Sequence, residues 1–260
     1  MPFTVSHVAA VLPLYRWLAR WHLFSAAVIG SMVPDFGMLL PGFWPRVETH
    51  GLGALLRFCL PVGLLTYWLT QLLVKPAVVE VLPDRQYLKL QTMHPPVRPS
   101  DGRAWIYAGV TIVLGAVTHL LWDAFTHEDS RGVRMFPVLQ DYGPELGGHA
   151  VRLYRWLQHG SSVFGLLAVL IAIIVWARRA PQPPTAPARR LRPLERKLWG
   201  AMYLTIPAGA VVAAVAAMMM RGQQLFVASG ALEFIAISGM RATILTLLAV
   251  SLLLRVRLLH

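Results

Sequence analysis

Charged residues are scarce in this chain, and acidic residues are scarcer than basic ones. Only 14% of the 260 residues are charged, 56% are hydrophobic, and the mean hydropathy is +0.56. Soluble domains carry about 25% charged residues, so the composition excludes an ordinary soluble protein and indicates an integral membrane protein. The 24 basic and 12 acidic residues give a formal net charge of +12. Because no nucleic-acid-binding motif accompanies this excess, we interpret it as an orientation signal and as contact with anionic lipid headgroups.

Cysteine pairs are lacking too, and so is the residue pattern of a cleavable leader. Cys59 is the only cysteine, which excludes an intrachain disulfide and leaves the redox compartment open. The first residues show no charged region followed by a long apolar stretch and a cleavage site. We therefore expect the N-terminus to be retained.

Five apolar runs are long enough to cross a bilayer, which takes about 20 residues. They are Leu52–Val74, Ala104–Phe125, Gly160–Ala177, Leu198–Met220 and approximately Leu232–Leu254. Before them, Met1–Trp21 and Leu23–Val33 are each too short to span, and we expect two short helices that form a hairpin, the second ending at Pro34-Asp35. The sequence thus predicts an all-α, polytopic helical membrane protein with an N-terminal helical hairpin and about five transmembrane helices.

The polar connections set the expected organisation. Lys75–Arg103, which contains His94 between two helical runs, and Glu128–Gln158 are expected to be connecting loops. No internal repeat and no separable soluble domain stand out. We divide the chain into a helical membrane domain at residues 1–177, a basic, proline-rich cytoplasmic linker at 178–197, and two C-terminal transmembrane helices at 198–260.

Basic residues gather in alternate connections. Arg178–Lys197 contains seven Lys or Arg residues, Lys75–Arg103 contains five, and the C-terminal tail has Arg255 and Arg257. The positive-inside rule places all three stretches in the cytoplasm. We therefore expect a multi-pass protein of the cell inner membrane with a cytoplasmic C-terminus.

A polar stripe ends the second apolar run. His119, Asp123 and His127 are spaced four residues apart, so on a helix they lie on one face. Ionisable groups are costly in hydrocarbon and usually mark a functional interior. A neutral imidazole and a carboxylate one turn apart can together hold a divalent metal. The alternative is a helix end at which these side chains simply meet interfacial water.

Other ionisable residues are expected at the same, outer membrane face. The hairpin would bring His7, at the start of its first helix, beside Asp35, at the end of its second. His50 falls at that face under the predicted orientation. Arg57 could hold an anionic headgroup there, although we favour the simpler interpretation that its side chain snorkels to the interface.

Several blocks of the sequence resemble a bacterial membrane-protein family of unknown function. The resemblance covers most of residues 1–180. The first blocks are MPFTVSHVAAVLPL at the start of the chain and Gly30–Phe36; the later ones are Thr118–Asp123, Thr126-His127, Gly132-Val133 and Pro137. More distantly, the pattern is similar to metal-dependent hydrolases of the bacterial inner membrane.

The distant resemblance implies a particular site and chemistry. Its ligands would be His7, Asp35, His50, His119 and Asp123, and the polar stripe adds His127 as a reserve candidate. The hydrolases tend to have His-Arg-Gly-x-Thr-His-Ser where only Thr49-His50-Gly51 stands here, so one ligand of their pattern is missing. Such ligands suit a divalent metal, above all zinc, which activates water and polarises a carbonyl or phosphoryl oxygen. The expected substrates are lipid-like molecules, phosphoesters or amides, and the expected partners are membrane lipids.

Two non-enzymatic functions stay open. A transporter would also use intramembrane His and Asp, but it should place polar groups through several spans, and the runs Gly160–Ala177 and Leu198–Met220 carry no charged side chain. A structural or assembly protein would need no converging ligands. The small-residue run Ala208–Ala217 could then pack against a partner helix, as in a homo-oligomer.

Overall fold

The computed structural model describes residues 4–19, 22–39, 46–93, 102–146, 149–179, 190–220 and 231–259. The chain forms two compact units, residues 1–67 with 99–176 and residues 68–98 with 177–260. The proline-rich part of the predicted linker, residues 180–188, and His94 in the predicted loop lie outside the described residues.

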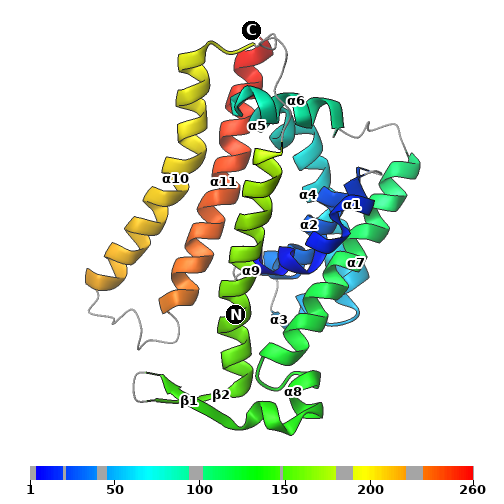
Figure 1. The fold of residues 1–260 in the computed structure, drawn as a ribbon, viewed down its shortest axis with the longest axis vertical. Coiled ribbons are helices and arrows are strands. Elements are labelled where there is room, and N and C mark those ends of the chain that lie inside the picture. The colour runs from blue at the N-terminus through cyan, green and yellow to red at the C-terminus, as the bar shows by residue number, and fades with distance from the viewer. Residues whose placement is uncertain are drawn as a thin grey trace. The chain divides into compact units, whose positions relative to one another are not determined.

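Within these described ranges, five helices are long and apolar enough to cross a membrane, which confirms the predicted all-α polytopic architecture (Figure 1). The first, Leu55–Val81, comprises the π-helical turns η4 (Leu55–Cys59) and η5 (Thr70–Val74) and the α-helices α4 (Leu60–Leu69) and α5 (Lys75–Val81). The others are α7 (Gly102–Thr126), α9 (Leu153–Arg178), α10 (Pro193–Met220) and α11 (Ala231–Leu259).

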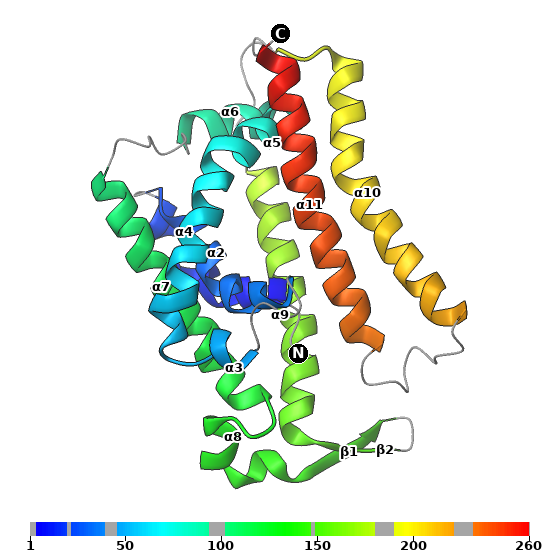
Figure 2. The same ribbon diagram turned by 180° about the vertical axis from the view of Figure 1, so that it is seen from behind.

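The two predicted loops contain more regular structure than expected. Residues 75–93 continue as α5 and then form α6 (Asp84–Met93), a helix that buries Tyr87. Residues 131–152 form α8 (Arg131–Met135), the 3-10 turn η6 (Pro137–Gln140) and an antiparallel hairpin of β1 (Tyr142–Leu146) and β2 (His149–Arg152), which leads into α9 (Figure 2). The loop predictions were wrong there because polarity marks where a chain leaves hydrocarbon, not where its helices end.

The N-terminal hairpin is present. Its first arm is η1 (Thr4–Leu14) with α1 (Tyr15–Leu18), and its second is α2 (Phe24–Met32) with η3 (Val33–Leu39). At the turn, His22 has a left-handed backbone (φ 58°), its N–H donates to Ala19 O, and Leu23 N–H donates to Leu18 O. This pair of bonds is typical of a Schellman helix end. Contrary to prediction, the second arm does not stop at Pro34-Asp35 but tightens into a 3-10 helix through Leu39.

Two glycines allow α2 and α7 to cross with their backbones in contact. A Cβ on Gly30 would collide with Ile112 O, and one on Gly115 would lie 2.6 Å from Ala27 O and 2.8 Å from Ser31 N. Only glycine fits at such distances. The crossing brings the last turn of α2 against the residues that follow Gly115 on α7, where the polar stripe begins.

The second unit is built around α10 and α11, which run side by side (Figures 1 and 2). Its core includes Ala77, Leu191 and Leu254. The Tyr203 and Ser251 hydroxyls form a hydrogen bond of 2.9 Å between the two helices.

Candidate metal centre

The structure brings the five predicted site residues together in the first unit. His7 comes from η1, Asp35 from η3, and His50 directly follows α3 (Arg46–Thr49), whereas His119 and Asp123 both come from α7. Four of the five are buried, and His50 is half-buried. Two sets of ligand atoms each lie within 4.8 Å of one another: His7, His119 and Asp123, and Asp35, His50 and His119.

His119 is held by the helix crossing. Its Nδ1 lies 2.8 Å from Ser31 O at the end of α2. A carbonyl oxygen can only accept, so Nδ1 carries the proton, and in the neutral ring Nε2 has the free lone pair. A backbone partner of this kind is the usual support of a metal-binding histidine.

Asp35 is oriented by a hydroxyl from the other arm of the hairpin. Thr4 Oγ1 donates to Asp35 Oδ2 at 2.7 Å, which leaves Oδ1 facing two imidazoles. Oδ1 lies 3.2 Å from His50 Nε2 and 3.6 Å from His119 Nε2. The other nitrogen of His50, Nδ1, lies 2.8 Å from Thr49 Oγ1, so that ring is also fixed from behind.

Asp123 closes this arrangement. Its Oδ2 lies 3.5 Å from His119 Nε2 and 3.6 Å from His50 Nε2. Most of these nitrogen–oxygen distances are too long for good hydrogen bonds. They are close to the ligand–ligand separation of about 3.3–3.4 Å that tetrahedral coordination with bonds of about 2.0–2.1 Å requires. Asp35 Oδ1 and Asp123 Oδ2 therefore each lie between the same two Nε2 atoms, those of His50 and His119.

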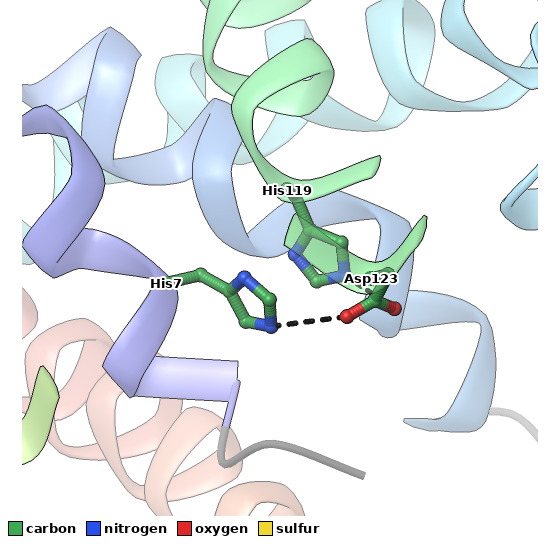
Figure 3. A group of neighbouring side chains, drawn as sticks. All are labelled: His7, His119 and Asp123. Carbon is green, nitrogen blue, oxygen red and sulfur yellow. Dashed lines mark ion pairs between the residues drawn. The ribbon is translucent and has the colours of Figure 1, made fainter. Parts of the chain in front are cut away.

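His7 completes the cluster from its other side. Its ring stacks on that of His119, with centroids 3.8 Å apart, and its Nε2 lies 3.5 Å from Asp123 Oδ1 (Figure 3). Burial lowers the pKa of His7 to about 4, and His119 adds to the shift, so the ring is neutral at physiological pH.

The residues fit a metal ion by the chemistry of their buried atoms. Among the described residues, the Nε2 atoms of His7 and His119 are buried and have no hydrogen-bond partner. Buried polar atoms are rarely left unsatisfied, because desolvation without a partner is costly. A cation beside the carboxylates would satisfy His119 Nε2, which belongs to both sets of ligand atoms.

Comparison with known proteins places the chain in a family. A family described as a domain of unknown function, DUF4184, matches residues 1–254. The chain belongs to this family. No curated protein and no solved structure matches the chain. The DUF4184 match agrees with the resemblance to a family of unknown function, and it spans both units.

The two further candidates in this DUF4184 chain differ in position. His127 is half-buried, and its Nδ1 lies 3.5 Å from Asp123 Oδ1 and 3.2 Å from Asp123 O, so it borders the cluster. Arg57 is exposed on η4 and belongs to neither set of ligand atoms. Its exposure agrees with the interpretation that we favoured, a side chain that reaches the interface.

The supporting groups of the site were not predicted from the sequence. Thr4 stands three residues before His7 on a 3-10 helix, where such residues share a side. The spacing of Thr4 and His7, in a block that carries the family resemblance, could have indicated that Thr4 lies beside the site. Ser31 contributes only its carbonyl oxygen, which no side-chain pattern can reveal.

Proposed function

We propose that the first unit binds one divalent metal ion, with zinc the best fit, and that the protein is a metal-dependent hydrolase of the bacterial inner membrane. The observation that carries the proposal is a set of four close approaches, of 3.2–3.6 Å, in which Asp35 Oδ1 and Asp123 Oδ2 each lie near both His50 Nε2 and His119 Nε2. Two imidazoles and two carboxylates are ligands that suit zinc.

The remaining groups prepare these ligands. A hydrogen bond from Thr4 orients Asp35, and the contact with the Ser31 carbonyl fixes the tautomer of His119. The Thr49 hydroxyl contacts the far nitrogen of the His50 ring. His7 and His127 flank Asp123 Oδ1, each with a ring nitrogen 3.5 Å away. The more exposed His127 imidazole is the group placed to accept or return a proton beside the reacting bond, whereas the buried, neutral His7 supports Asp123 from the other side.

One edge of the site is more exposed to solvent than the rest. The side chains of His50 and His127 are 11% and 19% exposed, against 0% for His119 and 2% for Asp35. Water and substrate would therefore approach between His50 and His127. A bound metal supplies Lewis acidity and a water of lowered pKa. Hydrolysis places the hydroxyl of water on the carbonyl carbon or phosphorus and its proton on the leaving oxygen or nitrogen.

Metal analysis of protein purified in detergent without chelators tests the proposal. Wild type is expected to hold about one zinc per chain and to hydrolyse a chromogenic ester or phosphodiester. Chelation should remove both metal and activity, and added zinc should restore them. Arg57→Ala, outside the cluster, should keep the metal. If wild type contains no stoichiometric transition metal and zinc titration shows no saturable site, the proposal is wrong.

Membrane orientation is a separate expectation, and α9 allows it to be tested. Because α9 spans the membrane, a residue before it and one after it lie on opposite sides. Glu145→Cys should react with an impermeant maleimide in intact cells, whereas Arg190→Cys should react only after lysis, if the basic stretch is cytoplasmic. Both positions are exposed, and native Cys59 is buried. The reverse labelling pattern would refute the cytoplasmic C-terminus and the location of the site at the outer face.

A further inference from the structure

An apolar groove lies at the end of α7. Its volume is about 410 Å³, within the range of small-molecule sites. Trp122, Phe125 and Thr126 of α7 form one wall, Phe136 and Leu139 near η6 form another, and Leu157 of α9 closes it. The metal cluster does not use these side chains.

The groove adjoins the candidate metal centre through a single hydroxyl. Thr126 lines the groove, and its Oγ1 lies 3.2 Å from His127 Nδ1. The same nitrogen of His127 is 3.5 Å from Asp123 Oδ1. A molecule lying in the groove would therefore have one end beside the half-exposed edge of the cluster.

The groove is continuous with the surface that faces the bilayer. Trp122 and Phe125 belong to a membrane span and are 47% and 40% exposed. Exposed apolar side chains on a span contact lipid hydrocarbon. An apolar molecule in the bilayer could enter the groove sideways without crossing water.

The chain builds this concavity with fixed contacts. The Ser130 hydroxyl is within hydrogen-bonding distance of both Ala124 O and His127 O, which ties the start of α8 to the end of α7. Gly132 permits the close approach, since a Cβ there would lie 2.5 Å from Ala124 O. Phe136 then packs against Phe125, with ring centroids 5.9 Å apart. The walls of the groove are therefore held in place by contacts within the first unit.

We propose that this groove holds one acyl chain of a membrane lipid, and that the substrate of the site is such a lipid. Its ester, phosphoester or amide linkage would reach the edge formed by His50 and His127. The binding of the chain follows from the groove and its continuity with the lipid-facing surface. The cleavage of the lipid rests on the proposed hydrolase function.

Photolabelling tests the binding. The protein is reconstituted in vesicles of phosphatidylethanolamine and phosphatidylglycerol that contain a phospholipid with a diazirine on one acyl chain, and the adducts are mapped by mass spectrometry. Adducts should concentrate on residues 122–126 and 136–139. Leu139→Trp, whose larger side chain would fill the groove, should reduce this labelling about tenfold, which corresponds to a loss of about 1.4 kcal/mol in binding free energy. Leu167→Trp, an exposed position elsewhere on α9, should leave it unchanged.

The possible failures are distinguishable. Adducts spread evenly over the exposed positions of α7 and α9, or undiminished labelling in Leu139→Trp, would overturn the acyl-chain site. Thermal unfolding in detergent reports whether the variant folds, and if Leu139→Trp does not fold, Leu157→Trp on the opposite wall takes its place. Labelling needs no metal, so a groove that labels in a protein without metal supports lipid binding and rejects only the hydrolase. Stoichiometric metal without selective labelling rejects only the groove.

Discussion

Asp123→Asn is expected to abolish stoichiometric metal binding while leaving the protein folded. One oxygen of Asp123 faces His50 and His119, and the other faces His7 and His127, so this carboxylate contacts every histidine of the cluster. The amide is nearly the same size but carries no charge and offers only one oxygen. Loss of a direct ligand should cost more than the 10–100-fold in affinity that is typical for a supporting residue.

The measurement is metal content, together with zinc titration by calorimetry. Asp129→Asn is the matched control, because Asp129 is exposed and its positive φ of 60° is one that asparagine also adopts. Thr4→Val should give an intermediate result, since it removes only the hydroxyl that orients Asp35. Full metal occupancy in Asp123→Asn would mean that Asp35, His50 and His119 suffice as ligands.

Gly115→Ala is expected both to destabilise the first unit and to weaken its metal binding. The new methyl group would lie 2.6 Å from Ala27 O and 2.8 Å from Ser31 N, both backbone atoms of α2, so the helices must separate. Overpacking of this kind typically costs about 1–3 kcal/mol. Because the Ser31 carbonyl holds His119 Nδ1, the same displacement would release a metal ligand.

Whether Gly115→Ala lowers or raises the stability of the first unit distinguishes a backbone clash from helix propensity. Alanine favours a helix over glycine by about 1 kcal/mol, so helix propensity alone predicts stabilisation. Gly160→Ala on α9 isolates that contribution, since nothing lies within 4 Å of a Cβ there. Thermal unfolding in detergent and zinc titration of both variants are the measurements. Gly115→Ala with unchanged unfolding temperature and zinc affinity would show that the crossing is not as tight as described.

The apolar runs and residue spacing were enough to predict the main outline of the fold, whereas the full set of five candidate ligands was implied by the distant resemblance to metal-dependent hydrolases. His119 and Asp123 lie on one face because a helix repeats every 3.6 residues. His7 and Asp35 both lie against the His119 ring. They come together because two runs that are too short to span must fold back on each other. The ends of these runs were less predictable. The 3-10 helix through Leu39 and the hairpin at 142–152 depend on packing and hydrogen bonds that residue polarity does not encode.

Features that depend on three-dimensional contact could not be predicted. Gly30 and Gly115 are ordinary small residues in the sequence, and only the crossing of α2 with α7 shows why a side chain cannot stand there. The groove has the same origin, since Trp122, Phe136 and Leu157 come together only when the segment after α7 folds back. Apolar residues near the end of a span carry no signal of a concavity.

The order of the ligands along the chain has a consequence for biosynthesis. His7 and Asp35 leave the ribosome well before His119 and Asp123, and the hairpin that carries them is too short to span the bilayer on its own. Thr4 already donates to Asp35 within the hairpin, but His7 and Asp35 approach Asp123 and His119 only once α7 is inserted against it. The newly made hairpin must therefore wait, incompletely packed, for a later segment of the same chain. A nascent protein truncated before α7 should be a preferred target of membrane quality-control proteases, whereas one extended past Thr126 should escape them.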